Sequence, residues 1–199
     1  MTDLLRWVVT SLVLAVVILL VALRRFPAFV TRVYVRRFGR WIGFEPWNRF
    51  QRASLPHAGA DRVVRSSPDM LNMFGAFDAS AEPVRIRCFV PGWDAYWSIS
   101  LYAWNTDNFY VLNDQMRKAG ELELIIVRPG GKHQKKENEE VVTSPTARGV
   151  IVIRAVVKNP EDPEEVARVE ELLHRTTISR YSDKEERGPN VGGAGAAAH

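Results

Sequence analysis

The residues with the most obvious chemical capacity are aspartates and asparagines that gather in the middle of the chain. They are Asp69, Asn72, Asp78, Asn105, Asp107, Asn108, Asn113 and Asp114. Oxygen atoms of this kind could bind a hard cation such as Ca²⁺, but the spacing does not match an EF-hand loop. Asn and Asp also form turns by bonding nearby backbone groups, which is the favoured interpretation. We therefore predict no metal site.

No motif for covalent, phosphoryl-transfer or metal-assisted catalysis is present in the sequence. The histidines are scattered, at His57, His133, His174 and His199, and a structural or solvated role is expected for each. We predict no catalytic residue and no cofactor. A hydrolase that uses the Asp and Asn residues is the least favoured alternative.

Aromatic residues are dense between positions 93 and 110, where they are Trp93, Tyr96, Trp97, Tyr102, Trp104, Phe109 and Tyr110. Strand alternation places Trp97 on one face and Tyr96, Tyr102 and Trp104 on the other. One face should belong to the core. The other could line an apolar pocket or a subunit interface, with Tyr96, Tyr102, Trp104 and Asn108 as candidate ligand-binding residues. A core role for both faces is the favoured alternative.

The amino-terminal region sets the location of the protein. Residues 7–23 are apolar, without charge or proline, and a helix that spans a bilayer needs about 17 to 25 such residues. Trp7 and Phe26 flank the run as interfacial aromatics do. We predict a membrane anchor over residues 1–25. A cleaved signal peptide is the alternative, but the sequence before Arg24 is a poor cleavage site.

A basic segment follows at residues 26–44, where helical spacing separates apolar residues from arginines. Arg25, Arg32, Arg36 and Arg40 cluster on one face. The segment could lie on anionic lipid headgroups or pack on the protein's own domain, and both interpretations stay open. Residues 1–52 carry nine arginines and two acids, whereas the remainder carries 18 basic and 21 acidic residues. The folded part is thus mildly acidic, which argues against nucleic-acid binding.

Beyond residue 61 the apolar residues alternate, which predicts β-strands. The runs lie at 84–90, 97–103, 122–127 and 149–157, with shorter candidates at 62–65 and 109–112. A helix is predicted over residues 163–176 after an Asp162 N-cap. Cys88 should be a buried thiol. Residues 132–140 should form a solvated hairpin tip, and residues 187–199 a disordered tail. The fold class is an antiparallel β-sandwich or partial barrel over residues 47–180.

Several stretches resemble domain of unknown function (DUF) 1254. They are the R-x-x-P-D motif from Arg65 to Asp69 with the following Asn72 and Asp78, residues 96–102, residues 106–109, residues 144–149 and residues 160–162. Ala76, Ala103 and Met70 depart from the family pattern. The resemblance covers residues 47–178 and implies a β-sandwich of bacterial origin in the cell envelope. It supplies no activity, so Arg65, Asp69, Asn72 and Asp78 are expected to brace the fold, with Arg65 pairing Asp69 or Asp78.

Together these observations predict a single-pass protein of the bacterial inner membrane that is not an enzyme. Its sandwich would act as a binding or assembly module for an envelope partner or a second copy of the chain. A small-molecule or lipid-binding protein with an aromatic pocket is the alternative. The arginines after residue 23 favour a cytoplasmic domain by the positive-inside rule, whereas the family resemblance favours a periplasmic one, which we expect.

Overall fold

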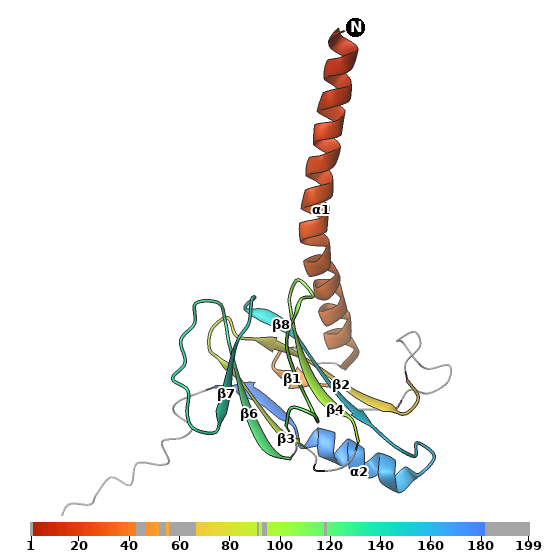
Figure 1. Ribbon diagram of the computed structural model, residues 1–199, viewed down its shortest axis with the longest axis vertical. Coiled ribbons are helices and arrows are strands. Elements are labelled where there is room, and N and C mark those ends of the chain that lie inside the picture. The colour runs from red at the N-terminus through yellow and green to blue at the C-terminus, as the bar shows by residue number, and fades with distance from the viewer. Residues whose placement is uncertain are drawn as a thin grey trace, which may run out of the picture.

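The computed structural model describes residues 2–42, 47–51, 55, 67–90, 92, 95–117 and 119–181. The first element is helix α1 (Thr2–Ile42), which projects away from a compact β domain (Figure 1). Residues 3–37 contain an apolar window that could cross a membrane, and none of that window is buried. The apolar run and the basic segment therefore form one helix, and α1 continues through Pro27. Arg65, the 62–65 strand candidate and the 187–199 tail lie outside the described residues.

The β domain consists of two sheets. The first sheet has the order β1-β2-β8-β4-β5 and is antiparallel throughout; the second has the order β7-β6-β3-β9. The strands of the first sheet are β1 (Arg49–Phe50), β2 (Met70–Asp78), β8 (Arg148–Val156), β4 (Trp97–Ala103) and β5 (Asn108–Asn113). Those of the second are β7 (Glu139–Thr143), β6 (Gly120–Val127), β3 (Val84–Val90) and β9 (Thr177–Arg180).

The core lies between the two sheets, because one side chain in two along each strand faces inward. Trp97, Phe77 and Leu71 are among its largest fully buried residues. Strands β2, β8 and β4 follow one another across the centre of the first sheet, with Met73 opposite Ile153 and Ile153 opposite Ile99. The predicted β-sandwich is thus confirmed, and it is not a closed barrel.

Helix α2 (Pro163–His174) covers one end of the sandwich and contacts β2, β3 and β8. Its N-cap is Asp162, whose carboxylate accepts a hydrogen bond from the backbone N–H of Glu164 at 3.0 Å. Val169 and Leu173 bury the apolar stripe of the helix in the core. This helix and its cap were predicted from the sequence, and both are confirmed.

The hairpin predicted for residues 132–140 is wrong. Strands β6 and β7 pair in parallel, with Glu123 opposite Glu139, and parallel neighbours cannot be joined by a tight turn. The chain instead crosses over through residues 128–138. His133 in this crossover and Glu139 at the start of β7 are buried rather than solvated, with side-chain exposures of 6% and 3%.

Candidate binding groove

The outer face of the second sheet divides into a covered half and an open half. In the covered half, Tyr181 packs with Ile125 and Val127 beneath the 128–138 crossover. The ring of His133 meets the ring of Tyr181 edge to face, with centroids 4.5 Å apart. His133 Nε2 also lies 2.7 Å from Glu139 Oε2, which accepts the backbone N–H of Lys136 at 3.0 Å. These contacts fasten the crossover to the sheet.

The boundary between the two halves carries a shared ion pair. Arg85 is 4% exposed, and its Nε lies 2.6 Å from Glu123 Oε1. The Nε of Arg87 lies 3.6 Å from the same oxygen, and the Arg87 side chain is 59% exposed. Because β3 residues 85 and 87 point to the same face, both arginines reach one carboxylate. The buried arginine thus neutralises Glu123, and Arg87 remains accessible to solvent.

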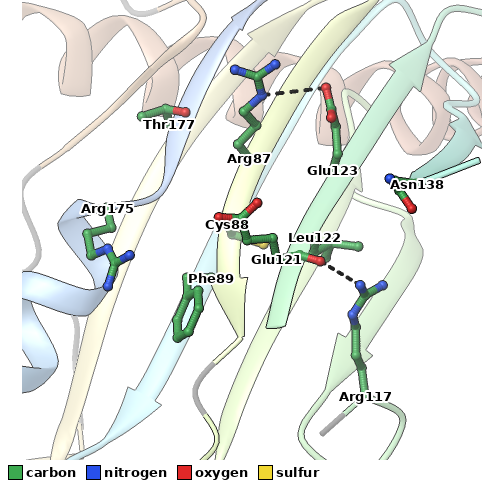
Figure 2. A pocket seen from close by; sticks show the side chains of 10 residues that line it. All are labelled: Arg87, Cys88, Phe89, Arg117, Glu121, Leu122, Glu123, Asn138, Arg175 and Thr177. Atoms are coloured by element: carbon green, nitrogen blue, oxygen red, sulfur yellow. Dashed lines mark hydrogen bonds and ion pairs between the residues drawn. The ribbon is translucent and has the colours of Figure 1, made fainter. Parts of the chain in front are cut away.

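The open half is a groove of about 650 Å³. Its lining comes from β3, β6, the start of β9 and three connecting segments, as Figure 2 shows. The ten residues are Arg87, Cys88, Phe89, Arg117, Glu121, Leu122, Glu123, Asn138, Arg175 and Thr177. The volume lies within the range of sites for small molecules, about 300 to 1,000 Å³.

Two further arginines stand on either side of the β3–β6 pair in Figure 2. The guanidinium of Arg175, just beyond α2, lies over the Phe89 ring at 4.9 Å from the centroid. Arg117 precedes β6 and donates from Nη2 to the carbonyl oxygen of Glu121 at 2.6 Å. A guanidinium has five N–H donors, so each contact leaves further donors for a ligand.

The arginines of the groove are suited to binding anions. Arginine stays protonated at all physiological pH values and matches carboxylate or phosphate geometry. Burial raises the pKa of the Cys88 thiol to about 12, so this cysteine is not a nucleophile at neutral pH. Among the described residues, no group of three His, Cys, Asp or Glu side chains could hold a metal ion.

The four predicted ligand-binding residues do not line this groove. Tyr96 precedes β4 and Trp104 follows it, so roughly 25 Å of extended chain separates them. The Tyr96 hydroxyl donates to Ser98 Oγ at 2.8 Å. Tyr102 is half-buried, and Asn108 is exposed at the start of β5. The alternation of β4 correctly predicts that Trp97 faces away from Tyr96 and Tyr102, since Trp97 is 1% exposed and lies in the core.

Trp104 belongs to a different structure, a clamp that joins the segment after α1 to the first sheet. Its ring lies 5.5 Å from that of Trp47, and the Arg148 guanidinium lies 4.8 Å from the Trp47 ring. Arg148 Nε donates to Asp78 Oδ2 at 2.8 Å. The backbone N–H of Asp78 donates to Asn48 Oδ1 at 3.0 Å. The chain that leaves α1 is therefore fixed to β2 and β8.

The remaining motif residues act locally. Asp69 accepts the Ser67 hydroxyl at 2.7 Å, and Asn72 donates to the carbonyl of Met70 at 3.1 Å. Asn113 caps the turn after β5 by accepting the backbone N–H groups of Gln115 and Met116. The side chain of Asn105 donates to Asp107 in another turn. The Asp and Asn residues thus lie in separate turns instead of forming one cluster.

Arg25, Arg32 and Arg36 are exposed on α1, and the side chain of Arg40 lies outside the described residues. Thr31 and Val35, one helical turn apart, are buried, at 7% and 3% exposure. In Figure 1 this end of α1 is the one nearer the β domain. The two interpretations of the basic segment are therefore compatible, because one face of the helix is covered by other parts of the chain and the arginines face outward.

Sequence reasoning did not identify the groove, because its arginines come from positions 87, 117 and 175. One local signal was present: Arg85 and Arg87 alternate with core residues along β3, as Glu121 and Glu123 do along β6. That alternation predicts charges on one face of the sheet. It does not predict that the face is hollow there, since this depends on where the crossover and α2 end.

The fold and the groove define a class of protein: a two-sheet β-sandwich that follows a helix long enough to cross a membrane. The chain belongs to the family described as "Protein of unknown function (DUF1254)", whose model matches residues 47–178. No curated protein matches the sequence.

A solved structure shows the same fold. The VPA0106 protein from Vibrio parahaemolyticus is similar with a TM-score of 0.64 and 16% sequence identity, over 82% of this chain and 37% of that one. An uncharacterised protein from Burkholderia cenocepacia is similar with a TM-score of 0.37 and 16% identity, over 53% of this chain and 31% of that one. This chain thus corresponds to little more than a third of the Vibrio protein.

Proposed function

We propose that the protein is a single-pass protein of the bacterial inner membrane whose β-sandwich is a non-enzymatic binding module held close to the bilayer. The observation that carries the proposal is α1, in which an exposed apolar span continues without a break into turns where Thr31 and Val35 are buried. Thr31 follows Leu23 by eight residues, or roughly 12 Å of helix. The sandwich would therefore sit beside the headgroup layer.

The groove is the binding face in this proposal, with an envelope component as its partner. The small-molecule alternative is supported by the groove's volume and places the ligand there rather than beside Tyr96 and Trp104. We further propose a periplasmic position for the sandwich, in keeping with the family resemblance. The arginines of α1 would then lie on the lipid surface beside the domain, although they would favour the opposite orientation if topology followed charge alone.

Extraction of membranes with alkaline carbonate tests the anchor. The full chain should stay in the pellet, and Leu14→Arg, in the centre of the apolar run, should shift it to the supernatant or prevent its insertion. Lys158→Arg, on an exposed turn of the sandwich, is the control and should stay in the pellet. A full-length wild-type chain that is released by carbonate would refute the anchor, and a shortened chain would show that the segment is a cleaved signal.

A further inference from the structure

We propose that the groove binds a small ligand that carries two negative charges, a dicarboxylate or a phosphomonoester. The inference rests on the proposed role of the groove as a binding face and adds the class of ligand. It does not depend on which side of the membrane the domain occupies.

The charge of the groove is unbalanced. Arg87, Arg117 and Arg175 line it, and all three are at least partly accessible. Of the two lining carboxylates, Glu123 is neutralised from below by the buried Arg85 at 2.6 Å. Among the described residues, no arginine lies at ion-pair distance from the other lining acid, Glu121. Glu121 therefore offsets one of the three arginine charges. Two positive charges are left in excess, which a dianion would match.

Two of the three arginines are held in place before a ligand binds. Arg175 and Arg117 flank the β3–β6 pair, and Arg87 lies further along β3 (Figure 2). Arg175 is held over the Phe89 ring, and Arg117 is held by the carbonyl of Glu121. These contacts already restrict the two side chains, so less side-chain entropy is lost when a ligand binds. Planar forks of this kind bind carboxylate and phosphate oxygens in pairs.

The floor of the groove adds an apolar surface. Phe89 is half-buried and points into the groove from β3. A ligand with a flat carbon skeleton could rest beside this ring while its charged groups reach the arginines. We therefore expect phthalate to bind more tightly than succinate, and phenyl phosphate more tightly than inorganic phosphate.

Isothermal titration of the full chain in a nonionic detergent, at low ionic strength, tests the proposal with these four probes. Phthalate or phenyl phosphate should bind with one site per chain, and whichever is tighter identifies the natural anion as carboxylate or phosphate. Arg175→Gln and Arg87→Gln should each weaken binding roughly tenfold or more, as expected for a lost charge-assisted hydrogen bond. Arg180→Gln, on β9 but outside the groove, should leave the affinity unchanged.

Absence of binding by all four probes would overturn the proposal. So would equal weakening by Arg180→Gln, which would indicate general attraction to a basic surface. Thermal unfolding of each variant separates lost binding from lost structure. Arg87 suits this comparison because its ion pair with Glu123 is long, at 3.6 Å. Carbonate extraction of the same variants should be unchanged, so failure of the ligand assignment and failure of the membrane anchor give different results.

Discussion

Asp78 and Arg148 form an ion pair that ties the end of β2 to the start of β8, with Nε and Oδ2 2.8 Å apart. The pair also supports Trp47, over whose ring the Arg148 guanidinium lies. Asp78 and the 144–149 stretch of the family motif therefore meet at one end of the first sheet. They hold the chain that arrives from α1.

Asp78→Asn should destabilise the sandwich by about 1 kcal/mol, because it removes a charge-assisted hydrogen bond at a partly exposed site. Arg148→Gln should cost a similar amount, and the double variant should cost less than the two changes added together. Urea unfolding followed by tryptophan fluorescence measures all three. Strict additivity would show that the two side chains do not interact in solution.

Acid should remove the stability that this pair provides. Burial opposes ionisation of Asp78, but hydrogen bonds from Ser80 and the charge of Arg148 outweigh it and lower the pKa of the carboxyl. A lowered pKa in the folded state stabilises the fold at neutral pH, and this gain is lost as the pH falls from about 4 through the folded pKa. In Asp78→Asn the unfolding free energy should therefore decline less steeply between pH 5 and 3 than in the wild type. Equal slopes would contradict the lowered pKa.

The His133–Glu139 pair should hold the 128–138 crossover on the second sheet. Burial opposes ionisation of Glu139, but the hydrogen bonds from His133 and from the backbone of Lys136 lower its pKa. Glu139→Gln should cost about 1 to 3 kcal/mol, since the polar partners stay buried. Hydrogen exchange of residues 128–138 should accelerate while that of β2 changes little. Glu137→Gln, on the exposed part of the crossover, is the control, and an equal effect there would exclude an anchoring role for Glu139.

Gly149 is the glycine whose replacement should matter most. An added Cβ would meet the backbone oxygen of Tyr102 and the ring of Phe77. Backbone cannot yield as a flexible side chain can, so Gly149→Ala should destabilise the sandwich by about 3 kcal/mol or more. Val150→Ala, at the half-buried neighbouring position, should cost about 1 kcal/mol. Similar midpoints of thermal unfolding for the two variants would contradict the close approach of β4 and β8.

Val35 should hold the end of α1 on the sandwich. Val35→Asp places a charge at a buried position, whereas Val33→Asp places one on the exposed face of the same helix. Trypsin should therefore cleave at Arg36 or Arg37 several-fold faster in Val35→Asp than in Val33→Asp or the wild type, because packing protects the helix. Equal cleavage rates would show that α1 does not pack on the domain.

Strand β3 and helix α2 are predicted from the sequence because apolar and polar residues alternate along them with the period of a strand or a helix. Strand β4 is predicted in the same way, although Ser98 and Ser100 on its outer face are buried too, and β8 is predicted from its apolar run. Strand β2 was missed because its outer face is also apolar, at Met70, Phe74 and Ala76, so that no alternation marks it. The parallel pairing of β7 was missed because it depends on a crossover between distant segments. The groove was missed for the same reason.

We propose a sandwich that α1 holds on the periplasmic face of the inner membrane. Paired fusions at the carboxyl terminus test it most directly, with alkaline phosphatase active only in the periplasm and green fluorescent protein active in the cytoplasm. We expect active alkaline phosphatase and a green fluorescent protein fusion that does not fluoresce. Both fusion proteins should stay in the membrane pellet after carbonate extraction. Inactive phosphatase with a bright fluorescent fusion would contradict it and would place the sandwich and its groove in the cytoplasm.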